Sequence, residues 1–196
     1  MAKNLPVVKI SEKILRLTAK DVSIDAIKSK KVQELIEDMN MTLSSTPNGV
    51  GLAAPQVDQS LRIFIVSEEA EEIDRVERNQ GKRVRRGKIQ NEAGEDEEAY
   101  KKREWRHYVF INPKVLNKSR TKLERAEGCL SVPGTFGELK RFEKITISAF
   151  DERGKKFIRG ATRFFARVIQ HELDHLDGVL FSDKAKNLID EDEIRT

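Results

Sequence analysis

The 196-residue chain lacks several features that would assign it to an extracellular or membrane class. It has a single cysteine, Cys129, so no disulfide can form within the chain. No apolar run approaches the roughly 18 residues that a membrane-spanning helix needs. The basic N-terminus is not followed by a hydrophobic signal segment. These absences predict a protein of the cytoplasm, or of an organelle matrix if the chain is a mature form, that has no membrane partner and keeps its cysteine reduced.

The chain also lacks a strong charge imbalance. Its formal net charge is +4, which is too small to indicate a nucleic-acid partner, and we expect no sequence-specific nucleic-acid binding. With 38% hydrophobic residues, a chain of 196 residues can bury one substantial core. We therefore expect residues 1–196 to form a single catalytic domain.

Histidine is scarce, yet two of the three histidines lie four residues apart in the run QHELDHL, residues 170–176. On a helix, this spacing places His171 and His175 on one face with Glu172 beside them. Two imidazoles that bind a divalent cation, with a carboxylate near a metal-bound water, are the groups that metal-assisted hydrolysis needs. The alternative is a helix with two ordinary surface histidines and a solvated glutamate.

The third metal ligand is expected upstream of this helix. An extended metalloprotease signature would require a histidine at the position of Phe181, and no histidine follows His175. Cys129 lies in the run EGCLS, which suits a tightly turned strand end. A lone cysteine is more often a small buried hydrophobe. Beside two histidines that lack a third ligand, we interpret Cys129 as that ligand, with the fourth tetrahedral position left open for water.

A third segment, GVGLAAPQ at residues 49–56, has one glycine on each side of Val50. These glycines allow a close approach of the backbone to a ligand. Ala54 stands where a dinucleotide-binding fingerprint would need its third glycine, which argues against that motif. Taken alone, the segment is an ordinary loop that leads into a buried strand.

In this order, the three segments resemble the peptide deformylase family, whose pattern has a G-φ-G-φ-A-A-x-Q loop, an E-G-C-L-S strand end and a Q-H-E-x-D-H-L helix. The 42 positions that separate His171 from Cys129 also resemble the family's usual separation. The resemblance implies that one divalent metal ion is bound by Cys129, His171 and His175. This ion would be ferrous iron in the cell, with zinc, nickel or cobalt as substitutes in a purified sample.

The resemblance also implies the reaction. Members of the family remove the formyl group from the N-terminal formylmethionine of newly made proteins and release formate. Glu172 would be the general base and acid that acts on a metal-bound water, while Gln56 and the backbone amide of Leu130 would bind the oxyanion. The implied partners are N-formylmethionyl nascent peptides and, transiently, the ribosome. The alternative role of Gln56 is to brace the loop or the strand of Cys129.

Helix geometry places Phe164 and Val168 on the same face as His171, where they would form the wall of an apolar pocket. The set expected to bind substrate is Val50, Gly51, Glu127, Phe164 and Val168. The alternative for the two helix residues is an ordinary place in the core. Glu127 could also form an ion pair with Arg167, and Asp174 could accept the second ring proton of a histidine ligand.

The predicted fold class is α+β, with short antiparallel or mixed strands packed around the central H-E-x-x-H helix. Periodicity predicts an N-terminal helix over 30–43 and the motif helix over 162–177, ended by Gly178. Strands are expected at 62–66, 108–111, 144–150 and 156–158, and the last two form a hairpin around a turn at 151–154.

Residues 67–106 form a charged insertion, with 12 acidic and 11 basic residues in 40 positions. Such a segment buries little apolar area, so it is either an exposed helical excursion or a disordered loop. It makes the separation of Gln56 from Cys129 longer than is usual in the family. An unknown partner would fit its charges, although a solvated insertion is the favoured reading. The chain also ends soon after Phe181, so docking on the ribosome by a long basic C-terminal helix is not expected.

Three hypotheses follow from the sequence. The first is a working deformylase. The second is a metallopeptidase on the same helix, which would cleave unformylated peptides and is disfavoured by the missing downstream ligand. The third is a binding protein without catalysis that uses the charged insertion as an interaction arm.

Overall fold

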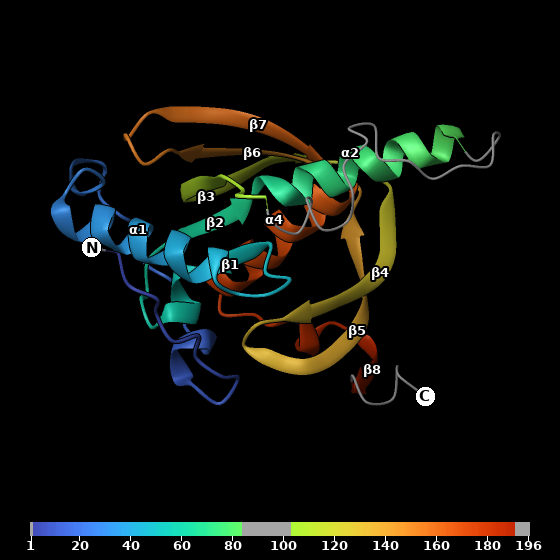
Figure 1. Cartoon of the computed structure of the whole chain (residues 1–196), viewed down its shortest axis with the longest axis horizontal. Helices are drawn as coiled ribbons and strands as arrows, with labels where there is room; N and C mark the ends of the chain where they lie inside the picture. The colour runs from blue at the N-terminus through green and yellow to red at the C-terminus, as the bar shows by residue number, and fades with distance from the viewer. Residues whose placement is uncertain (1, 84–102, 191–196) are drawn as a thin grey trace.

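The computed structural model describes residues 2–83 and 103–190, and Figure 1 shows their arrangement. In chain order, the elements are the 3₁₀ turns η1 (Lys13–Arg16) and η2 (Ile24–Ala26), α1 (Lys30–Ser44), β1 (Gly51–Ala53), the 3₁₀ turn η3 (Ala54–Val57), β2 (Ile63–Ser67), α2 (Glu68–Arg83), β3 (His107–Lys118), β4 (Lys122–Cys129), β5 (Val132–Phe142), β6 (Lys144–Phe150), β7 (Lys156–Thr162), α4 (Arg163–Leu176), η4 (Phe181–Asp183) and β8 (Lys186–Asp190).

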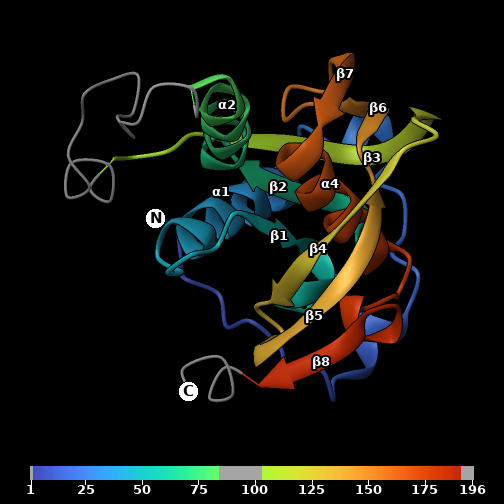
Figure 2. The ribbon, with the colours of Figure 1, turned by 90° about the vertical axis from the view of Figure 1, so that its right-hand side faces the viewer.

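The strands form two antiparallel sheets (Figure 2). The first has the order β1-β2-β3-β6-β7, and the second has the order β4-β5-β8. The predicted mixture of helices and antiparallel strands is therefore confirmed. The strands are not all short, because β3 has 12 residues and β5 has 11. Among the described residues, parallel pairing is limited to an isolated bridge between Lys20 and Leu61.

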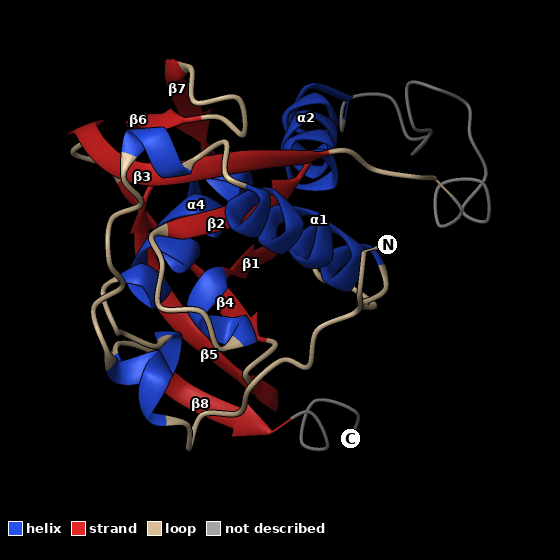
Figure 3. Ribbon diagram, turned by 90° about the vertical axis from the view of Figure 1, so that its left-hand side faces the viewer, coloured by secondary structure: helices blue, strands red, loops and turns tan. Residues whose placement is uncertain are grey.

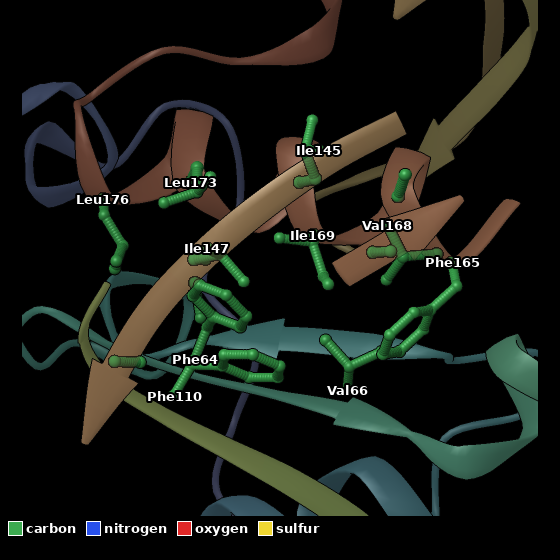
Figure 4. Close-up of a cluster of buried hydrophobic side chains, with 14 of the residues drawn as sticks. Phe64, Val66, Phe110, Ile145, Ile147, Phe165, Val168, Ile169, Leu173 and Leu176 are labelled. Atoms are coloured by element: carbon green, nitrogen blue, oxygen red, sulfur yellow. The ribbon is translucent and has the colours of Figure 1, made fainter. Parts of the chain in front are cut away.

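The five-stranded sheet is covered on both faces, and β2 shows why. All five residues of β2 are buried. Phe64 and Val66 pack in one cluster with the apolar side chains of α4 (Figure 4). The alternate residues Ile63 and Ile65 pack with the apolar side chains of α1. This helix lies on the other face of the sheet (Figure 3). Because side chains alternate along a strand, one short apolar run holds both helices.

Helix α1 confirms the helix that periodicity predicts. Its N-cap is Ser29, whose hydroxyl oxygen accepts a hydrogen bond from the backbone N–H of Val32 at 3.4 Å. Val32, Ile36 and Met39 are buried on the side that faces the sheet. A Ser cap before an apolar stripe is a strong local signal, so local sequence is sufficient to predict this helix.

The predicted strands at 108–111, 144–150 and 156–158 lie within β3, β6 and β7, and the strand predicted at 62–66 matches β2 except that β2 begins at Ile63. Sequence patterning missed β1, β5 and β8, and it recognised only the cysteine end of β4. β4 and β5 carry many charges on an exposed face, which hides their alternation. No helix in the two described ranges is long and apolar enough to span a membrane.

The charged insertion begins with α2. Residues 68–83 therefore form the helix that was one of the two structures predicted for this segment. This helix is not simply solvated, because Ala70 is fully buried and Asp74 is 2% exposed. Ala70 packs in the cluster that contains Phe165 and Val168 of α4. Residues 84–102 lie outside the described residues, and 103–106 have no regular secondary structure.

Candidate metal centre and active-site pocket

Helix α4 presents the two motif histidines on consecutive turns. The ring centroids of His171 and His175 are 5.0 Å apart, and the ring planes meet at 75°. His175 is 1% exposed. The helix ends one residue later, and Gly178 follows with a φ of +74°. A Cβ at Gly178 would lie 2.8 Å from the backbone of Arg16, so glycine is needed for its conformation and for this contact.

Cys129, at the end of β4, lies opposite these histidines. Its Sγ is 3.2 Å from Nε2 of His175. One donor atom from each of Cys129, His171 and His175 lies within 4.8 Å of the others. A thiolate and two imidazoles are a donor set that divalent transition metals accept in tetrahedral geometry, with one position free for water or substrate. The residues therefore fit a catalytic metal site.

Glu127 fixes one of the proposed ligands. Its Oε2 lies 3.1 Å from Nδ1 of His171. A carboxylate at this distance favours the tautomer with the proton on Nδ1, which leaves Nε2 as the neutral donor. The sequence assigned Glu127 to the substrate. The carboxylate borders the cavity, and its oxygens also contact Arg141, Arg167 and His171.

Two buried arginines bind the same carboxylate. Arg141 donates from Nε and Nη2 to the two oxygens of Glu127 at 2.9 and 2.8 Å. Arg167 donates from Nη1 to Oε1 at 2.6 Å, so the contact expected from the sequence is present. Burial alone would raise the pKa of Glu127, but hydrogen bonds from Arg141 and His171 outweigh it and hold the pKa at about 2. The carboxylate is therefore charged at every physiological pH.

Arg167 also fastens α4 to the second sheet. Its guanidinium donates to the carbonyl oxygens of Leu123 at 2.6 Å and Leu139 at 3.0 Å. These carbonyls belong to β4 and β5, and β4 ends at Cys129. The same side chain therefore helps to hold the cysteine strand against the histidine helix.

Asp174 does not have the role that the sequence suggested. Its Oδ2 pairs with Nη1 of Arg141, and its Oδ1 accepts from Lys184 at 2.8 Å. Nδ1 of His175 has no hydrogen-bond partner within the described residues. Because Asp174 points to a different part of the helix surface, it stabilises Arg141 rather than a metal ligand.

Glu172 lies between the histidines and the glycine loop. It is 3% exposed, and its Oε2 has no hydrogen-bond partner in the described part of the chain. Burial raises the pKa of Glu172 to about 7. A Cβ at Gly51 would lie 2.4 Å from Oε1 of Glu172 and 2.9 Å from Cγ1 of Val168. The glycine therefore leaves the space that this carboxylate occupies.

Gln56 connects the glycine loop with the cysteine strand. Its Oε1 accepts from the backbone N–H of Ala53 at 2.8 Å. Its Nε2 lies 3.6 Å from Sγ of Cys129 and donates to Oγ of Ser131 at 3.3 Å. The bracing contacts considered as its alternative role are thus present, and the amide nitrogen also borders the cavity.

A cavity of about 400 Å³ opens beside these groups. The predicted residues that line it are Val50, Gly51, Gln56, Glu127, Cys129, Leu130, Phe164, Val168, His171 and Glu172. His175 lies next to the cavity wall, buried behind Cys129. The three sequence segments therefore meet at one pocket, and Phe164 and Val168 border it while they also pack in the core.

Sequence reasoning missed Arg141 and the role of Ser131. Arg141 follows Gly137 and Leu139 at every second position on the buried side of β5. A charged residue at a buried position of this alternation needs a partner, which would have been the available signal. Ser131 is fully buried and is the last residue of the EGCLS run, but no local pattern distinguishes it from an ordinary turn residue.

Comparisons with known proteins point to one family. The family model for polypeptide deformylase matches residues 4–191. A peptide deformylase of Symbiobacterium thermophilum is 36% identical over 185 residues, which cover 94% of this chain and 68% of the relative. Peptide deformylase 1 of Bacillus cereus is 37% identical over 165 residues, which cover 84% of this chain and 83% of the relative.

A solved structure is similar as well. The class I type b peptide deformylase from Acinetobacter baumannii, with Met-Ala-Ser bound, superposes with a TM-score of 0.72 at 32% sequence identity. The match covers 94% of this chain and 99% of that chain. The chain therefore belongs to the polypeptide deformylase family of enzymes.

Proposed function

We propose that this chain is a metal-dependent hydrolase that removes the N-formyl group from formylmethionyl nascent peptides and releases formate. One observation carries the proposal: Cys129, His171 and Glu172 border the same cavity, and one donor atom from each of Cys129, His171 and His175 lies within 4.8 Å of the others. The product-like peptide in the Acinetobacter baumannii structure, Met-Ala-Ser, is the kind of molecule that this reaction would release. We assign the reaction to residues 1–196 acting as one catalytic domain.

Cys129, His171 and His175 are the proposed metal ligands. When bound, a divalent cation would act as a Lewis acid and lower the pKa of a water molecule toward about 7. Ferrous iron is the ion we expect in the cell, and zinc, nickel or cobalt would occupy the same donors. Glu127 would keep the ring of His171 in its ligating orientation, because its Oε2 lies at Nδ1 of that ring.

Glu172 is the proposed proton carrier. Its Oε2 has no hydrogen-bond partner among residues 2–83 and 103–190 and is buried beside the histidines. There it can accept a proton from water as the water oxygen attacks the formyl carbon. The carbon–nitrogen bond then breaks, and Oε2 of Glu172 returns the proton to the departing nitrogen. Formate and a free amine result, and the carboxylate regains its starting charge.

Gln56 and the backbone amide of Leu130 are the proposed donors to the developing oxyanion. Both residues border the cavity, and Nε2 of Gln56 lies at its cysteine side. Val50, Gly51, Phe164 and Val168 would contact the methionine side chain. Removal of one oxyanion donor typically costs about 3–4 kcal/mol of transition-state stabilisation.

The test is formate release from formyl-Met-Ala-Ser by anaerobically purified protein loaded with ferrous iron. The matched variant is Glu172→Gln, which keeps the shape of the side chain and removes its ability to carry the proton. Wild-type protein should release formate, and the variant should lose the activity while it retains about one metal ion per chain, as for a proton-transfer group. Absence of formate release by fully metallated wild-type protein would refute the proposal.

A further inference from the structure

Helix α4 starts without a cap of its own. Its first turn contains no acidic residue, and the side chain of Thr162 at the N-cap makes no capping hydrogen bond to the helix in the described structure. The first turn of a helix leaves backbone N–H groups without partners and carries the positive end of the helix dipole. A helix that starts against the protein interior therefore needs an acceptor from elsewhere.

Asp74 of α2 supplies that acceptor. Its Oδ1 accepts the backbone N–H of Phe164 at 3.2 Å, and its Oδ2 accepts the hydroxyl of Thr162 at 2.7 Å. Asp74 is 2% exposed. A buried carboxylate at this place satisfies an N–H group and lies at the favourable end of the dipole, as an N-cap side chain does within its own helix.

The two hydrogen bonds flank a residue with an unusual backbone. Arg163 lies between Thr162 and Phe164 and has a φ of +44°. Residues other than glycine rarely adopt this conformation, and it persists only where the surroundings fix it. Asp74 holds the residues on both sides of Arg163, so it fixes the turn from which α4 begins.

Helix α2 is itself anchored, so Asp74 is held in place. Ala70 is fully buried in the cluster that includes Phe165. Oε2 of Glu71 accepts the hydroxyl of Tyr108 at 2.8 Å and Nη2 of Arg159 at 2.6 Å. The spacing of 70, 71 and 74 puts these residues on one side of α2. Helix α2 lies beside α4 (Figure 1), and the hydrogen bonds of Asp74 bring this side to the start of α4.

We propose that Asp74 is a positioning residue for the substrate pocket. By fixing the start of α4, it sets where Phe164 stands in the wall of the cavity, two turns before His171. The first part of the charged insertion thereby takes part in substrate selection. The inference rests on the proposed deformylation for its kinetic consequence, whereas the capping itself is independent of any reaction.

The test compares Asp74→Ala with Asp74→Asn. The asparagine variant keeps a carbonyl oxygen for the N–H of Phe164, and the alanine variant removes both acceptors. The matched control is Glu72→Ala on the same helix, because Glu72 pairs with Arg75 at 2.6 Å rather than with α4. Amide hydrogen exchange at Phe164 measures capping without activity, and the KM and kcat for formyl-Met-Ala-Ser measure the pocket.

Asp74→Ala should speed exchange at the Phe164 amide and raise KM, each by about tenfold or more, since a lost hydrogen bond to a charged group is large enough for this. The kcat should stay within about threefold, because the metal donors and Glu172 are unchanged. Asp74→Asn should restore most of both values, and Glu72→Ala should match the wild type. A purely structural role would lower stability without this separation of KM from kcat.

Unchanged exchange and unchanged KM in a folded Asp74→Ala variant would overturn the proposal. If that variant does not fold, Thr162→Val tests the proposal instead, because it removes one of the two hydrogen bonds that Asp74 accepts. A raised KM in Thr162→Val supports the proposal, and a wild-type KM overturns it. If wild-type protein releases no formate, the proposed function fails, while exchange at Phe164 still decides whether Asp74 caps α4.

Discussion

Gly51 and Glu172 adjoin so closely that a Cβ on the glycine would lie 2.4 Å from Oε1 of the carboxylate. The Gly51→Ala variant should therefore displace Glu172 and lower kcat/KM by about a hundredfold, as expected when a catalytic group moves by about an ångström. The fold should persist, because one end of a side chain can shift. Gly160→Ala is the control, since no atom of the described residues lies within 4 Å of a Cβ there. Equal kinetics for the two variants would contradict this view of the glycine loop.

Loss of the Glu127 carboxylate should weaken metal binding. Glu127→Gln removes the charge that faces Nδ1 of His171 and leaves Arg141 and Arg167 without their shared anion. We expect metal affinity to fall by about 10- to 100-fold, as for other partners of histidine ligands. Competition with a chelator measures this affinity. Glu124→Gln on the same strand is the control, because Glu124 is exposed and pairs only loosely with Lys140 at 3.7 Å. A Glu127→Gln affinity equal to that of the control would exclude the orienting role.

Metal removal should destabilise the protein, since a ligand that binds only the folded state adds about 2.7 kcal/mol at a hundred times its Kd. Thermal unfolding with and without a chelator should show a lower Tm in the chelated sample. In Cys129→Ser, which weakens the donor set, the difference between the two samples should shrink. If the chelator leaves the wild-type Tm unchanged, the assignment of Cys129, His171 and His175 as a metal site loses its support.

His107 lies outside the proposed metal centre and should make the free energy of unfolding depend on pH. Burial lowers the pKa of His107 from its usual value of 6.5, and Nδ1 lies 3.0 Å from Oδ1 of Asn40. At His107, the unfolded chain therefore binds a proton at a higher pH than the folded chain. The part of the unfolding free energy that depends on neutral His107 is complete above pH 6.5 and is lost as the pH falls below it. Urea unfolding across this range should show a decline that is smaller in His107→Gln. The same slope in both proteins would contradict the prediction.

The sequence predicted best where the signal was local. The period of the helix placed His171, Glu172 and His175 together, and the missing downstream histidine directed attention to Cys129. The residues that support this site come from distant segments. Arg141 binds Glu127 across the pair β4–β5, and no motif marks it.

Asp74 shows the same limit more strongly. It lies in a run of charges that predicts solvent exposure, and its hydrogen bond to Thr162 spans 88 positions in the chain. Only the packing of α2 on α4 turns this carboxylate into a buried cap. Composition describes what a segment can bury on average, but the contacts of individual residues depend on the tertiary fold.

Deformylation is tested most directly by following both products from formyl-Met-Ala-Ser with iron-loaded protein. We expect formate and free Met-Ala-Ser in equal amounts, with the peptide bonds intact, because the cavity beside Glu172 and Cys129 would bind the formylated end. Unformylated Met-Ala-Ser should remain uncut. Cleavage of its peptide bonds, or no formate from fully metallated protein, would show that the enzyme is not a deformylase.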